Sequence, residues 1–103
     1  MPDPADRIEV RNVISPHHIT HVDRAKYLGM RAALLAVLPD TAPGLTPAQA
    51  QVALLPHLDA ALFPGGAKAG WWMKCVQLDL EFRGVVARAE KPPVRLHRVS
   101  GSP

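Results

Sequence analysis

The sequence predicts an α+β fold that is mainly helical, and three observations support this class. Residues 67–84 form a long apolar-rich run with helical spacing. Two earlier stretches, at 24–38 and from Thr46 onward, combine helical spacing with residues that cap helix starts. Two short runs at 85–90 and 94–99 have the composition of strands. We therefore expect three helices followed by a C-terminal β-hairpin.

The chain has 103 residues, which is the size of one domain. We expect a single domain over residues 1–103, with residues 1–7 and 100–103 loosely held. The N-terminus lacks the apolar core of a secretory signal, and no apolar run approaches the roughly 18 residues that a membrane span requires. The single cysteine excludes an internal disulfide. These features favour a soluble cytoplasmic protein with no membrane partner.

The N-terminal part is predicted to hold one short strand and the first helix. Residues 8–13 nearly alternate apolar with polar, which is typical of a strand with one covered face. Ser15 and Pro16 break this pattern, and we expect an irregular link from there to Asp23. Asp23 can cap a helix N-terminus, so the first helix is predicted over residues 24–38.

The second helix has the strongest local start signal in the chain. Thr46 is suited to the N-cap, Pro47 to the first helical position, and Gln49 completes a capping box. Pro56 ends or kinks this helix. Two faces could be buried, one formed by Ala48, Val52 and Leu55 and the other by Ala50, Ala53 and Leu54. We favour the first face because its side chains are bulkier.

The third helix, over residues 67–84, is predicted to bury a broad arc and to expose a narrow polar strip. The arc contains Trp71, Trp72, Cys75, Val76, Leu78, Leu80 and Phe82. The strip contains Gly70, Lys74, Gln77 and Glu81, at the neighbour spacing of one helix face. Asp79 falls inside the arc, and residues 76–82 also alternate as a strand would. Arg83 and Gly84 provide a good stop signal, because a cation suits the helix C-terminus and glycine can take the left-handed conformation.

Three stretches of the sequence resemble an uncharacterised family of small bacterial proteins. They read LPHL at 55–58, LFPGGAKAGWW at 62–72 and VQLDLEFRGVV at 76–86, and the resemblance extends over residues 8–98. The order of a strand, two helices, a longer third helix and a hairpin is that of a winged-helix domain. We therefore predict a winged-helix-like three-helix domain with an N-terminal strand and a C-terminal β-hairpin wing, whose tip is at residues 91–93. The resemblance implies no activity, substrate or catalytic residue.

The net charge of +3 is concentrated toward the C-terminus. Seven of the twelve Lys and Arg residues, but only three of the nine acidic residues, lie in residues 67–103. This excess favours a polyanion such as double-stranded DNA, with Lys74 and Gln77 facing base edges and hairpin cations contacting phosphates. The candidate nucleic-acid-binding residues are Lys68, Lys74, Gln77, Arg88, Lys91, Arg95 and Arg98.

The alternative is a protein-interaction domain that does not bind nucleic acid and that could form a homodimer. Trp71 and Trp72 diverge by about 100° around a helix, so both cannot enter one core. We expect one indole to be buried and the other to lie beneath the hairpin or at a partner surface. Both are candidate interface residues, since tryptophan is enriched at binding hot spots.

The other residues that could bind a metal or act in catalysis favour neither function. A metal site at His17, His18 and His21 is possible in principle, but a solvated polar linker is the better interpretation. Cys75 is expected to be a small core residue, and the glycines at 65–70 do not have phosphate-loop spacing. Asp79 and Glu81 point to different faces of a helix. We therefore expect neither an enzyme nor a cofactor or a small-molecule substrate.

Overall fold

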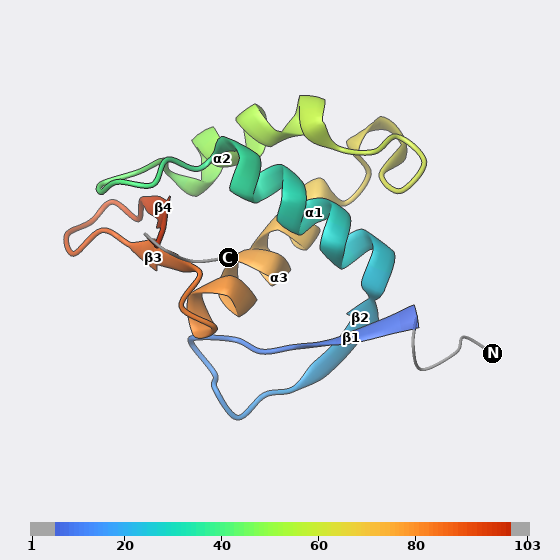
Figure 1. The fold of residues 1–103 in the computed structure, drawn as a ribbon, viewed down its shortest axis with the longest axis horizontal. Coiled ribbons are helices and arrows are strands. Elements are labelled where there is room, and N and C mark those ends of the chain that lie inside the picture. Colours follow the sequence, from blue (N-terminus) through green and yellow to red (C-terminus); the bar gives the residue numbers. More distant parts are fainter. Residues whose placement is uncertain (1–5, 100–103) are drawn as a thin grey trace.

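Helix α3 (Ala69–Phe82) lies at the centre of the fold, with α1 (Arg24–Val37) crossing in front of it (Figure 1). The computed structural model describes residues 6–99. The other elements are β1 (Arg7–Val10), β2 (Thr20–Asp23), α2 (Pro47–Leu54), the 3-10 turns Leu55–His57 and Pro64–Gly66, β3 (Val86–Arg88) and β4 (Leu96–Arg98). The α+β class, the three helices and the C-terminal hairpin are confirmed. None of the helices within residues 6–99 combines the length and the apolar character that crossing a membrane requires.

The N-terminal strand has a partner that the sequence did not predict. β1 pairs antiparallel with β2, in a register that places Val10 opposite Thr20 and Ile8 opposite Val22. The expected irregular link before Asp23 is therefore wrong over residues 20–23. In β2 only Val22 is apolar and buried, so this strand has no alternating pattern to detect. The expected loose ends at 1–5 and 100–103 lie outside the described residues, whereas Arg7 begins β1.

The C-terminal hairpin is joined by a residue from the loop before α2. β3 and β4 pair antiparallel, and Leu45 forms an isolated antiparallel bridge with Leu96. The Leu45 N–H donates to the Leu96 carbonyl at 2.9 Å, and the Leu96 N–H donates back at 2.6 Å. Gly44 permits this approach, because a Cβ at its position would lie 1.8 Å from the Leu96 carbonyl oxygen. The α1–α2 loop is thereby attached to the hairpin.

Local capping signals are confirmed at both predicted helix starts. The Asp23 carboxylate accepts a hydrogen bond from the Lys26 N–H at 3.0 Å. Thr46 and Gln49 form the reciprocal capping box, with distances of 3.1 and 3.0 Å. Each of these contacts satisfies an N–H group that the helix itself leaves without an acceptor.

The predicted buried face of α2 is wrong. Ala50 and Leu54 are buried, whereas Val52 is 71% exposed and Leu55 is also exposed. Apolar side chains occur all round this short helix, so bulk does not decide its orientation. The packing of α2 against α1 decides the orientation of α2 instead, because the small side chain of Ala50 allows the two helices to approach closely.

The end of α3 is also confirmed. Gly84 has φ +76° and donates its N–H to the Glu81 carbonyl, while the Val85 N–H donates to the Leu80 carbonyl. This pair of bonds is the Schellman arrangement that ends a helix at a left-handed glycine. It turns the chain directly into β3.

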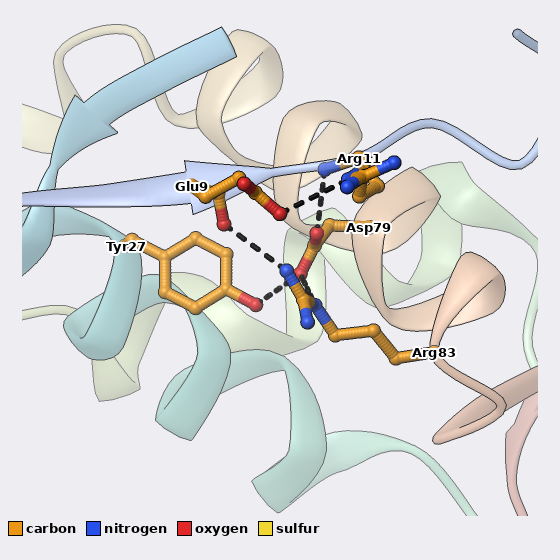
Figure 2. A network of polar contacts seen from close by, with 5 residues as sticks. All are labelled: Glu9, Arg11, Tyr27, Asp79 and Arg83. Atoms are coloured by element: carbon orange, nitrogen blue, oxygen red, sulfur yellow. Dashed lines mark hydrogen bonds and ion pairs between the residues drawn. The ribbon is translucent and has the colours of Figure 1, made fainter. Parts of the chain in front are cut away.

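A buried carboxylate connects α3 to α1 and to the N-terminal hairpin (Figure 2). Asp79 is fully buried and accepts hydrogen bonds from the Tyr27 hydroxyl, from Arg83 Nε at 2.9 Å and from the Arg11 N–H at 2.7 Å. Arg83 also donates to the Glu9 carbonyl at 3.1 Å. These contacts explain why an acidic residue lies within the apolar arc of α3, since a buried charge is tolerated when it is paired and hydrogen-bonded.

We expect Asp79→Ala to lower the free energy of unfolding by about 2–4 kcal/mol, because it leaves buried donors of Tyr27 and Arg11 without an acceptor. Chemical denaturation monitored by circular dichroism measures the change. Asp40→Ala is the control, since Asp40 is exposed. Equal unfolding midpoints for the two variants would contradict the assigned role.

We expect the protein to lose stability as the pH rises above about 10, the ordinary pKa of a tyrosine. Burial, followed by the hydrogen bond to Asp79, raises the pKa of Tyr27 in the folded state. The unfolded chain therefore releases this proton first, and alkaline pH favours unfolding. Tyr27 is the only tyrosine, so Tyr27→Phe should flatten the dependence of unfolding free energy on pH. An unchanged slope in that variant would refute this explanation.

Candidate functional site

Two hollows lie on either side of a strip of α3. The first, of about 240 Å³, lies between α3 and the N-terminal hairpin, and Trp71 and Val10 contribute to its walls. The second, of about 430 Å³, lies between α3, the start of α2 and the C-terminal hairpin. Lys74 and Leu78 line both hollows. We call this strip, together with the residues that line the two hollows, the α3 surface.

The two adjacent tryptophans have different environments, as the sequence predicts. Trp72 is buried and packs edge-on against Phe63, with ring centroids 6.3 Å apart. Trp71 is 57% exposed and meets Trp72 edge-on at 5.0 Å. The buried indole therefore supports the exposed one, which is held on a helix whose other face forms the core.

The α3 surface is apolar at its edges and cationic near its middle. Ile14 is 67% exposed and Val94 is 37% exposed, and both line the second hollow. Lys74 is exposed, and within residues 6–99 its side chain has no hydrogen bond or ion pair. Arg11 and His18 line the first hollow, and none of its lining residues among those described is acidic. Arg11 is partly neutralised, since it pairs with Glu9 at 3.0 Å.

The polar strip predicted for α3 is only partly exposed. Gln77 is 5% exposed, and its side-chain amide donates to Glu81 at 3.2 Å. The Glu81 carboxylate is itself covered and pairs with Arg88 of the C-terminal hairpin. The solvent-facing prediction is therefore wrong for Gln77 and Glu81, because the hairpin folds over this part of the strip. In this arrangement Gln77 does not present its amide to an external base edge.

The predicted nucleic-acid-binding residues do not all gather on one surface. Lys74, Gln77 and Arg88 line the second hollow together. Four others lie outside the residues that line the two hollows, namely Lys68, Lys91, Arg95 and Arg98. Lys68 is exposed just before α3, Lys91 and Arg98 are exposed on the hairpin, and Arg95 is half-buried.

The three N-terminal histidines are exposed in the structure. Within residues 6–99, there is no group of three or more histidine, cysteine or acidic side chains with the geometry to hold a metal ion. His17 and His18 lie in the loop between β1 and β2, whereas His21 lies within β2. His18 instead lines the first hollow, as Trp71 does.

Several residues of the α3 surface were missed by the sequence interpretation. They come from the N-terminal hairpin and its loop, namely Val10, Arg11, Asn12, Ile14, His18 and Thr20. All of these residues lie far from α3 in the chain, since even Thr20 precedes Ala69, the first residue of α3, by 49 positions. The pairing of β1 with β2 brings them together, and the hydrogen bonds of the Arg11 N–H to Asp79 and of the Val13 N–H to the Leu78 carbonyl hold them at the helix.

Cys75 is half-buried on α3, lines the first hollow and packs against the core, so it is less enclosed than the sequence predicts. Burial, with a smaller contribution from the charge of Asp79, raises the pKa of its thiol to about 11. At neutral pH the thiol is therefore protonated and a poor nucleophile.

Comparison with known proteins identifies the family of this chain. A family model described as a family of unknown function, DUF6958, matches residues 7–96. The chain belongs to this family. No curated protein and no solved structure matches this chain.

We expect the alkylation of Cys75 by iodoacetamide at pH 8 to be about tenfold slower in the folded protein than in the unfolded chain, where the thiol has its ordinary pKa. The rate in the folded protein should keep rising with pH beyond 9. Mass spectrometry at timed intervals measures the rate, and the denatured protein is the control. A rate that has already levelled off at about pH 10 would show an unperturbed thiol, since the ordinary thiol pKa is about 8.5.

Proposed function

We propose that this member of DUF6958 is a protein-interaction module that binds a partner protein through the α3 surface. The observation that carries this proposal is the exposure of Trp71 beside an apolar-walled hollow. Tryptophan contributes more binding energy than most residues when a partner covers it, and it concentrates near the centres of interfaces. An exposed indole next to a hollow is therefore well placed to anchor a partner.

Two further exposed apolar residues of the α3 surface support the same function. Ile14 and Val94 are exposed apolar residues at the edge of the second hollow, next to the helix that carries Trp71. Contiguous exposed apolar surface is uncommon on monomeric proteins and marks binding sites. Because α3 is anchored by the core on its opposite face, the surface is preorganised and loses little freedom on binding.

A winged-helix domain that binds double-stranded DNA is the second candidate, and one observation favours it. The bridge between Leu45 and Leu96 adds a third short segment to the C-terminal hairpin, a feature typical of winged-helix domains. Lys68, Lys91 and Arg98 remain exposed for phosphate contacts. We rank this candidate second because Gln77 is buried and Arg88 is paired with Glu81.

Both candidates are non-catalytic and need no cofactor. In the first, the partner is another protein or a second copy of the chain. In either case we propose that the protein acts in the cytoplasm.

We expect Trp71→Ala to abolish the capture of a specific partner protein that the immobilised wild-type chain retains. Captured proteins are identified by mass spectrometry, and binding is measured again with the purified partner. Val52→Ala is the matched control, because Val52 is exposed on α2 outside both hollows. Sedimentation velocity on the same variants detects self-association.

Equal retention of that partner by Trp71→Ala and Val52→Ala would refute the proposed interface. Binding to mixed-sequence duplex DNA, with affinity that falls steeply as salt increases, would favour the second candidate instead.

A further inference from the structure

We infer that the α3 surface recognises a protein segment that is both apolar and acidic, with an apolar side chain in the first hollow and a neighbouring carboxylate against Lys74. This inference rests on the proposed function of the same surface, and it adds the chemistry of the partner.

The size of the first hollow suits a side chain. Its volume of about 240 Å³ lies below the roughly 300–1,000 Å³ of sites that enclose a drug-sized ligand. Val10 of β1, and Trp71 and Leu78 on one face of α3, give it apolar walls on two sides. An apolar side chain of a partner would therefore be held between the helix and the N-terminal hairpin, in the manner of an anchor residue.

The positive charge of the α3 surface favours an acidic group of the partner beside this anchor side chain. Lys74 lies between the two hollows and has no acidic partner within residues 6–99, whereas Arg88 is already paired with Glu81. His18 adds a side chain that can donate a hydrogen bond in the first hollow, and Arg11 adds a positive charge that Glu9 partly neutralises. A carboxylate of the partner would gain an attraction to Lys74 that no acidic side chain among the described residues supplies.

The apolar edges distinguish a protein segment from a nucleic acid. Ile14 and Val94 line the second hollow beside Lys74, and their aliphatic side chains have no hydrogen-bond donor to offer a phosphate backbone. A protein segment that carries leucine or phenylalanine together with glutamate would complement both the apolar side chains and the positive charge of the α3 surface.

The test uses the full chain and two fluorescent peptides of equal length. Both contain leucine and phenylalanine at the same positions, but one has glutamate and the other lysine at the remaining positions. Fluorescence anisotropy at physiological salt should give an affinity for the glutamate peptide about tenfold higher than for the lysine peptide. Duplex DNA is measured in parallel.

Substitutions at Lys74 test whether this residue causes the preference for the glutamate peptide. Lys74→Glu should reverse the preference between the two peptides, and Lys74→Met should remove it. Lys91→Glu is the matched control, because it makes the same change of net charge at an exposed site outside both hollows. It should leave the preference within about twofold of wild type, since exposed charges at a distance are screened by salt.

Equal affinities for the two peptides, or equal effects of Lys74→Glu and Lys91→Glu, would overturn the inferred partner chemistry. So would a failure of both peptides to bind, or binding of duplex DNA that is stronger than binding of the glutamate peptide. The proposed function stands or falls separately, on the effect of Trp71→Ala on a captured protein.

Discussion

The buried carboxylate of Asp79 is the constraint on which the rest of the structure depends. A charge in a core is unfavourable unless donors surround it, and here the donors come from three elements (Figure 2). Tyr27 comes from α1, Arg83 from the end of α3 and the Arg11 N–H from the segment after β1. The three elements must therefore hold one relative position for the carboxylate to be satisfied.

This constraint also creates the candidate binding surface. The segment after β1 is held at α3 by Asp79, and the contact continues where the Val13 N–H donates to the Leu78 carbonyl at 3.3 Å. The N-terminal hairpin consequently stands beside Trp71 and Lys74 and forms one wall of the first hollow. The family match to residues 7–96 includes both this hairpin and α3, so the parts that build the surface belong to the shared domain.

Helix α3 illustrates why polar side chains are an unreliable guide to exposure. Gln77 and Glu81 satisfy each other and Arg88, so they can be covered by the hairpin without leaving a polar group unpaired. Trp71 shows the opposite case, an apolar side chain left in solvent because Trp72 already occupies the core. Both outcomes depend on which neighbour reaches the helix, and helical periodicity carries no information about that neighbour.

The sequence by itself determined where α1 and α2 begin, where α1 and α3 end, and where the last hairpin lies. These features depend on contacts within a few residues, such as the capping box of Thr46 with Gln49 and the left-handed turn at Gly84. Only the tertiary structure decided the pairing of β2, the buried face of α2 and the two hollows. They depend on contacts between distant parts of the chain, as when the Arg11 N–H reaches Asp79 across 68 positions. Local propensity and periodicity describe a residue and its near neighbours, whereas these features are selected by the packing of the whole core.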